Sequence, residues 1–270
     1  MTTSLSETAR DVTADATILA APPLLRIAGN VATITLRRPA THNRIEPDDV
    51  PVLRNFLQQL NANAAVRVIV FDSTGSSFSS GFDLSRLGTV ATGGENQFEQ
   101  LCDEIENACA VTIAKLHAPV YGGSTDLALA CDFRLGVRGM RMFMPAARLG
   151  LHYYGHGIRR WVSRLGLGAA KRLFLTSRPI DSNEMLRIGF LDALVDPDAL
   201  DAELATWVAE LLSMAPIPLV SMKVTLNETA RGQFNEQAAR AASVASLATR
   251  DIGEALAAFA EHRKPVFTGS

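Results

Sequence analysis

The segment from Thr112 to Asp132 constrains the fold more than any other part of this chain. A strand-like run, Thr112 to Leu116, leads through His117, Ala118 and Pro119 to paired glycines, Gly122 and Gly123, and Ser124 then begins a helix of small residues. The first N–H groups of a helix have no partner within it, and the helix dipole favours negative charge at that end. Glycine also allows close approach to the backbone, so the turn can hold a developing oxyanion.

A second turn of small residues complements the first. It runs from Gly75 to Leu84 and follows a β-branched, strand-like run from Val66 to Phe71. Its small side chains allow a tight backbone whose N–H groups face the same cavity as the glycine turn. Two backbone donors from separate loops would form an oxyanion hole. A serine- and glycine-rich surface loop without a ligand is the alternative interpretation of each turn taken alone.

The order of the predicted elements indicates an α/β core followed by helices. Most predicted strands lie in the N-terminal half, beginning with a hairpin over 24–27 and 31–36 and ending with a strand over 133–137. Helices are predicted between them over 48–60 and 94–110. Helical periodicity dominates after Gly155, over 159–165, 169–176, 182–188, 200–214, 219–229, 235–248 and 252–263. We therefore expect a flexible tail over 1–22, a core over 23–200, and a C-terminal helical region over 201–270 that packs on the core or on a neighbouring subunit.

Composition excludes several classes of partner. The chain has 270 residues, 47% of them hydrophobic, and a formal net charge of −2, so no strong field attracts nucleic acid or an anionic membrane. Its three cysteines form no CxxC pair and have no histidine at ligand spacing, which predicts neither disulfides nor a metal site and favours the reducing cytoplasm. No window approaches the roughly 18 apolar residues of a membrane span.

Several motifs in register resemble the crotonase superfamily, the enoyl-CoA hydratase/isomerase family. The resemblance extends from about Leu24 to Phe267. The matching pieces are the "RP...N" segment of residues 36–43, the "AGADL"-like turn of residues 79–84 and the "GGGxELALxCD"-like segment of residues 122–132. Further matches are Pro145, Leu149-Gly150, Gly166, Leu175-Thr176 and residues 258–265. Several motifs in order are far more specific than any one alone.

The resemblance implies a spiral of ββα turns that assembles as a trimer, or as a hexamer made of two trimers. It also implies an acyl-CoA thioester substrate, with coenzyme A present only as part of that substrate and no permanently bound cofactor. The thioester carbonyl would lie between the N–H groups of Phe82 and Gly123. By position, the residues that contact substrate or CoA would be Ala40, His42, Ser80, Gly81, Asp83, Leu84, Tyr121, Gly122, Pro145, Ala146 and Lys264.

The acidic residues depart from the family pattern. Hydratases of this family use two glutamates on one water, and Asp126 and Ala146 stand at those positions here. Alanine cannot exchange a proton, so hydration by the two-glutamate route is disfavoured. Asp126 is a candidate catalytic acid, although a carboxylate in the first turn of a helix can also serve only to complement the dipole.

The loop after Ala146 supplies other acid/base candidates. His152 and Tyr153 lie where the family carries a Pro/Gly-rich segment facing the acyl group, and decarboxylases of the superfamily have a tyrosine at a position that resembles Tyr153. The tyrosines could instead only fill the space left by Ala146.

Three functions therefore stay open. The first is an acyl-CoA-processing enzyme of the crotonase type that stabilises a thioester enolate in the oxyanion hole, with decarboxylase or C–C hydrolase chemistry as the alternative to hydration or isomerisation. The second is a non-catalytic acyl-CoA-binding protein, and the third is a serine hydrolase with Ser124 as nucleophile. The last is disfavoured because Asp126 stands where a nucleophile elbow needs glycine.

Overall fold

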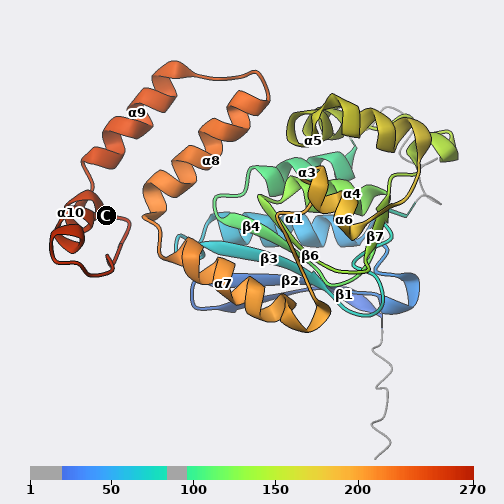
Figure 1. Cartoon of the computed structure of the whole chain (residues 1–270), viewed down its shortest axis with the longest axis horizontal. Coiled ribbons are helices and arrows are strands. Elements are labelled where there is room, and N and C mark those ends of the chain that lie inside the picture. Colours follow the sequence, from blue (N-terminus) through green and yellow to red (C-terminus); the bar gives the residue numbers. More distant parts are fainter. Residues whose placement is uncertain (1–19, 84–95) are drawn as a thin grey trace, which may run out of the picture.

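A computed structural model describes residues 20–83 and 96–270, and its centre is a six-stranded sheet (Figure 1). Strands β1 (Ala21–Ala28) and β2 (Val31–Arg37) form the predicted antiparallel hairpin. From β2 the sheet continues in parallel through β3 (Val68–Ser73), β4 (Val111–Leu116), β6 (Phe133–Val137) and β9 (Ala193–Val195). The first two residues of β1, 21 and 22, belong to the predicted tail; residues 1–19 of that tail lie outside the described part of the chain.

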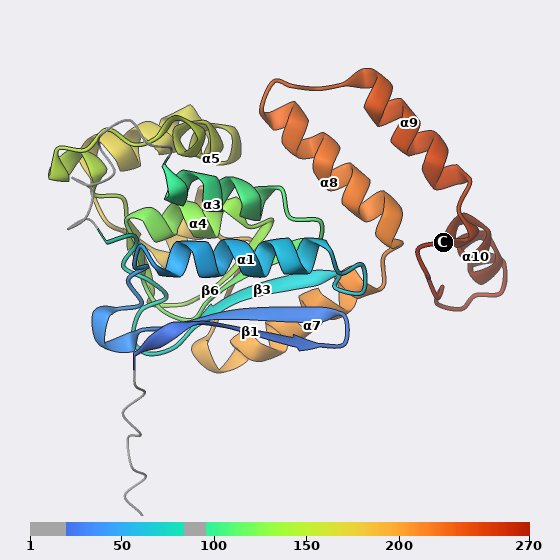
Figure 2. The same ribbon diagram turned by 180° about the vertical axis from the view of Figure 1, so that it is seen from behind.

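Helices cover both faces of this sheet. On one face lie α1 (Asp49–Asn61), α3 (Gln97–Glu106) and α4 (Gly123–Ala130), and α7 (Leu200–Leu212) lies on the other (Figure 2). Strands covered on both sides read as continuous β-branched runs, and five of the six residues of β3 and of β4 are buried. Because these strands are parallel, their carboxyl ends lie at the same edge of the sheet, and the loops after β3 and β4 meet there.

A small sheet beside that edge was not predicted. It joins β5 (Val120–Tyr121), β7 (Arg141–Phe143) and β8 (Ile180–Asp181), which are two or three residues long and carry no readable alternation. Short 3-10 turns, η1 (Pro39–Thr41), η3 (Ala146–Leu149) and η4 (Pro197–Ala199), were likewise absent from the sequence-based expectation.

The helix boundaries differ from the predicted ones by a few residues at several ends, and two of the differences have a clear local cause. The helix expected over 94–110 is α3, which begins after Asn96, whose side chain accepts hydrogen bonds from the N–H groups of Phe98 and Glu99. The two helices expected over 159–165 and 169–176 are the arms of one element, α5 (Gly155–Thr176), which bends at Gly166, where φ is +79°. Glycine adopts this left-handed conformation without the steric cost of a Cβ.

The last helices extend away from the sheet. After α6 (Ser182–Arg187) and α7 come α8 (Pro216–Ala230), α9 (Glu236–Leu247) and α10 (Arg250–Ala260), and Figure 1 shows these three at one end of the molecule. Lys223 on α8 forms an ion pair with Asp132 at 2.7 Å, which ties the near end of this region to the core. Large apolar side chains on these helices are exposed: Met222, Val224, Leu226, Val244, Leu247, Leu256 and Phe259.

No single helix of the described residues is both long and apolar enough to cross a membrane. The segments 197–212 and 216–230 meet the length and composition requirement only as a pair, and that pair is bent by 104°.

A buried carboxylate joins three helices. Glu106, at the end of α3, forms ion pairs with Arg159, Arg160 and Arg164 of α5 and with Arg231, which follows α8. Burial alone would raise the pKa of Glu106, but the guanidinium groups of Arg160, Arg164 and Arg231 outweigh it and lower the pKa to about 2. The charge of Glu106 therefore stabilises the packing of these helices.

We expect Glu106→Gln to destabilise the fold by about 3 kcal/mol at neutral pH, because buried Arg160 and the partly buried arginines around it then lose a counter-charge. The pKa of Glu106 is about 2 in the folded chain against an ordinary 4.5, so this stabilisation is complete above about pH 4.5 and is lost as the pH falls towards 2. Urea unfolding of both proteins between pH 3 and 7 measures it.

Glu210→Gln on the exposed face of α7 is the matched control and should change the free energy of unfolding by less than about 0.5 kcal/mol. If the difference in the free energy of unfolding between wild type and Glu106→Gln did not decrease below pH 4.5, the charge of Glu106 would not be the source of the stabilisation.

Candidate functional site

The two glycine turns of the sequence meet at the edge of the sheet. Gly81 has φ of +95°, and a Cβ at this position would lie 2.7 Å from the backbone nitrogen of Gly123. A Cβ on Gly123 would lie 3.4 Å from the nitrogen of Phe82. Only glycine at residue 81 allows this approach, which brings the N–H groups of Phe82 and Gly123 close together.

Side-chain hydrogen bonds hold the turns in place. Buried Asn43 donates to the carbonyls of Thr74 and Ser77, and its own side-chain oxygen accepts from the N–H of Arg38 at 2.8 Å. Ser124 Oγ bonds the carbonyl of Ser79 at 2.7 Å, which connects the start of α4 to the first turn. Ser124 is fully buried and committed to backbone carbonyls, an arrangement unlike that of an exposed nucleophile.

The N–H groups of Phe82 and Gly123 donate no hydrogen bond to any described residue. The parallel bridge between Ile45 and Phe82 uses the N–H groups of Ile45 and Asp83, which leaves that of Phe82 unused. Gly123 is the first residue of α4, so its N–H precedes the intrahelical hydrogen bonds. Two free donors thus lie side by side at a helix start.

Both residues line a cavity of about 700 Å³. Most of the predicted site residues line it too: Ser80, Tyr121, Gly122, Pro145, Ala146, His152 and Tyr153. It also contains residues that were not among the predicted site residues: Asn96, Phe98, Glu99, Phe143, Met144, Leu149, Leu151, Tyr154 and Gly155. A cavity of this size with a few convergent polar groups is suited to a small-molecule ligand.

Asp126 lies behind the wall of this cavity. It is fully buried, and its Oδ2 accepts hydrogen bonds from Tyr154 Oη and from Arg160 Nη1, both at 2.6 Å. Burial raises the pKa of Asp126, and the Arg160 guanidinium and Tyr154 hydroxyl partly offset that rise. Arg160 is itself fully buried and also binds Asp103 and Glu106. The cation that fixes Asp126 therefore belongs to an ion-pair network.

Two tyrosines connect Asp126 to the cavity. Tyr153 Oη donates to Tyr154 Oη at 3.0 Å, and the two rings stack with centroids 4.2 Å apart. Burial raises the pKa of both hydroxyls well above the usual value, and the Asp126 carboxylate raises them further. At neutral pH the pair is protonated and can donate a proton.

Ala146 and His152 complete the same wall. Ala146 begins η3 and presents only a methyl group, so the structure offers no carboxylate there. The His152 ring is exposed and forms no hydrogen bond to the described residues. It stays a candidate for proton transfer.

The remaining predicted residues lie elsewhere. Ala40 and His42 are exposed outside the cavity, with His42 Nδ1 3.0 Å from Ser77 Oγ. Asp83 is buried and faces Arg44 at 3.7 Å. Lys264 follows α10, which both views place away from α4 and α5 (Figures 1 and 2). Leu84 lies outside the described residues.

Tyr154 and Arg160 are the site residues that the sequence reading missed. The Tyr154 hydroxyl donates a hydrogen bond to Asp126, a contact that the sequence did not indicate. Arg160 is 34 residues from Asp126 along the chain, and its burial signals a charged partner only once the fold is known.

Comparison with known proteins identifies the family. Residues 26–270 match the family described as enoyl-CoA hydratase/isomerase. The chain belongs to this family. It is 26% identical over 244 residues to a crotonyl-CoA hydratase of Syntrophomonas wolfei, covering 88% of this chain and 94% of that protein. The solved structure of a putative enoyl-CoA hydratase from Streptomyces coelicolor superimposes with a TM-score of 0.83 at 26% identity, covering 100% of this chain and 98% of the other.

These relationships confirm the crotonase-like α/β fold and a family of enzymes that act on CoA thioesters. A short-chain-enoyl-CoA hydratase of Clostridium acetobutylicum is a further relative, 25% identical over 248 residues, covering 89% of this chain and 95% of that protein. The reaction of this member is a separate question.

Gly81→Ala should disrupt the meeting of the two turns. The added Cβ would lie 2.7 Å from Gly123 N and 3.0 Å from Tyr121 O, both backbone atoms that cannot rotate away. We expect a loss of stability larger than the roughly 1–2 kcal/mol of left-handed strain alone. Thermal unfolding and calorimetric binding of butyryl-CoA measure the two effects, and binding should weaken at least tenfold.

Gly139→Ala is the matched control, because φ is +86° there and a Cβ would meet nothing within 4 Å. Equal losses of stability in the two variants, with butyryl-CoA binding intact in both, would show that the contact is unimportant.

Proposed function

We propose that this chain is an acyl-CoA enzyme that forms a thioester enolate and then protonates it. The two free N–H groups of Phe82 and Gly123 at one cavity wall carry the proposal. They would accept the thioester oxygen as it gains negative charge, and one such donor is worth roughly 3–4 kcal/mol in the transition state. The start of α4 adds a favourable dipole.

Protonation of the enolate is assigned to the tyrosine pair. Tyr153 and Tyr154 line the cavity and keep their protons at neutral pH, while Asp126 and Arg160 behind them fix the orientation of Tyr154. A hydroxyl would give its proton to the α-carbon and regain one from solvent. His152 is the remaining proton-transfer group of this wall.

Cleavage of a carbon–carbon bond fits this site better than addition of water. Two-carboxylate hydration needs an acid at residue 146, and Asp126 is fully buried with its Oδ2 already bound. In decarboxylation the bond between the α-carbon and a carboxylate breaks, its electron pair enters the enolate, CO₂ leaves, and a tyrosine protonates the α-carbon. That sequence needs the two N–H donors and one acid. Hydrolytic C–C cleavage produces the same enolate and is the second candidate.

The decisive experiment compares two thioesters. Malonyl-CoA turnover is followed by CO₂ release, and crotonyl-CoA hydration by its enoyl absorbance. We expect decarboxylation to be faster, with Tyr154→Phe and Asp126→Asn lowering kcat about 10²- to 10⁴-fold and changing the Kd for butyryl-CoA less than threefold.

Asp132→Asn is the matched control, because Asp132 also pairs with a buried cation, Lys223, but does not line the cavity. Its kcat should match wild type. Crotonyl-CoA hydration faster than decarboxylation would overturn the proposed reaction. Binding without turnover of either thioester would instead indicate a non-catalytic acyl-CoA-binding protein.

We also propose that the chain assembles as a homotrimer or as a dimer of trimers. The large apolar side chains exposed on α8, α9 and α10 support this, because burying them against a neighbouring copy would remove apolar surface from water. The cavity has no lysine or arginine among its described lining residues, so Lys264 of a neighbouring copy would contact the CoA phosphates. A sedimentation mass of a single 29.0 kDa chain would contradict this.

The cytoplasm remains the proposed location. Cys102, Cys109 and Cys131 are all free thiols, which fits a reducing compartment. Of the three, Cys109 is exposed.

A further inference from the structure

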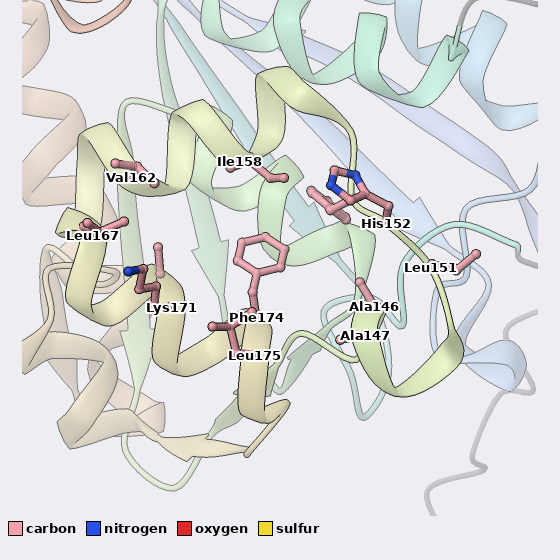
Figure 3. Close-up of a pocket in the computed structure, with 12 residues that line it drawn as sticks. Ala146, Ala147, Leu151, His152, Ile158, Val162, Leu167, Lys171, Phe174 and Leu175 are labelled. Carbon is pink, nitrogen blue, oxygen red and sulfur yellow. The ribbon is translucent and has the colours of Figure 1, made fainter.

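A second, apolar cavity lies under α5. It has a volume of about 250 Å³ and lies between the two arms of α5 on one side and η3 on the other (Figure 3). Ile158, Val162, Leu167, Ala170, Phe174 and Leu175 supply its apolar wall. Figure 3 shows Leu167 and Lys171 at one end and Ala146, Leu151 and His152 at the other. We call this space the α5 groove.

The α5 groove adjoins the cavity that holds the two free N–H groups. Ala146, Leu151, His152 and Tyr153 line both spaces and form the boundary between them. Ala146 is the smallest of the four. Its neighbour Pro145 lies against the glycine turn, because a Cβ on Gly122 would be 4.0 Å from Pro145 Cδ. The boundary therefore lies directly beside the proposed thioester position.

We propose that the acyl chain of the substrate passes Ala146 and lies in the α5 groove. The substrate class is then an acyl-CoA with an extended apolar chain, and Ala146 is the residue that determines its length. This inference rests on the proposed function, since it takes the thioester carbonyl to lie at Phe82 and Gly123.

The chemistry of the groove matches an alkyl chain. Apolar side chains form its wall, and a hydrocarbon chain that covers them removes apolar surface from water on both partners. Leu167 and Leu175 are 55% and 73% exposed, so the outer end is open. Lys171 lines that end but is itself exposed, so its ammonium group can remain in solvent while its stem contacts the chain.

Chain-length dependence of binding tests the proposal. Calorimetry with butyryl-, octanoyl- and dodecanoyl-CoA should show the Kd falling by up to about fourfold for each methylene that enters the groove, the equivalent of about 0.8 kcal/mol. Ala146→Leu narrows the boundary. It should weaken dodecanoyl-CoA binding at least tenfold more than it weakens butyryl-CoA binding.

A surface variant keeps the test independent of how Ala146→Leu folds. Leu175→Lys places a charge at the exposed outer end of the groove and should weaken dodecanoyl-CoA more than octanoyl-CoA, with butyryl-CoA unchanged. Leu186→Lys on α6 is the matched control: Leu186 is 42% exposed and lines neither cavity, so its profile should equal that of wild type.

A photoreactive probe locates the chain directly. Dodecanoyl-CoA with a terminal diazirine should label residues 155–176, and label confined to residues 96–106 or to the C-terminal helices would overturn the proposal. A Kd that does not depend on chain length would also overturn it. If Leu175→Lys changed only the sedimentation mass, the groove would be a contact between copies of the chain, and the proposal would again be wrong. Failure of butyryl-CoA itself to bind would refute the proposed function instead.

Discussion

The close approach of two backbone turns is the constraint on which the rest of the site depends. A Cβ on Gly81 would come within 2.7 Å of the nitrogen of Gly123, closer than real Cβ contacts allow. Asn43 and Ser124 use their side chains to hold these turns through backbone groups, which leaves the N–H groups of Phe82 and Gly123 unused. Backbone polar groups are normally paired, so two adjacent free donors facing a cavity indicate a ligand.

Charge burial is the second organising feature. Arg160 connects Asp126, Asp103 and Glu106, so the helix that covers the cavity is fixed by the same side chain that orients the Tyr154 and Asp126 pair. Removing one member of such a network leaves an uncompensated charge in a poorly solvated place. Site geometry and the packing of α3, α4 and α5 are consequently linked, and substitutions at Arg160 would affect both.

The family relationship and the site chemistry give different information. The match over residues 26–270 and the 0.83 TM-score define the fold and the family. The reaction depends on a few side chains, and here Ala146 and two tyrosines line the cavity. Ala146 also lines the α5 groove, which is why the proposed path of the acyl chain passes this residue.

The sequence alone determined the family, the α/β order and the glycine turns. It could do so because strand periodicity, glycine pairs and N–H donors at a helix start are local properties of the chain. Local patterns did not predict every element. Strands β5, β7 and β8 are too short to show a periodicity, and the two helices predicted on either side of Gly166 are one bent helix.

Tertiary structure decided what surrounds each predicted residue. It covered Asp126 with Tyr154, paired it with Arg160 from 34 positions away, and placed α10, which Lys264 follows, away from α4 and α5. Burial and long-range pairing depend on which surfaces meet after folding, and no local pattern records them.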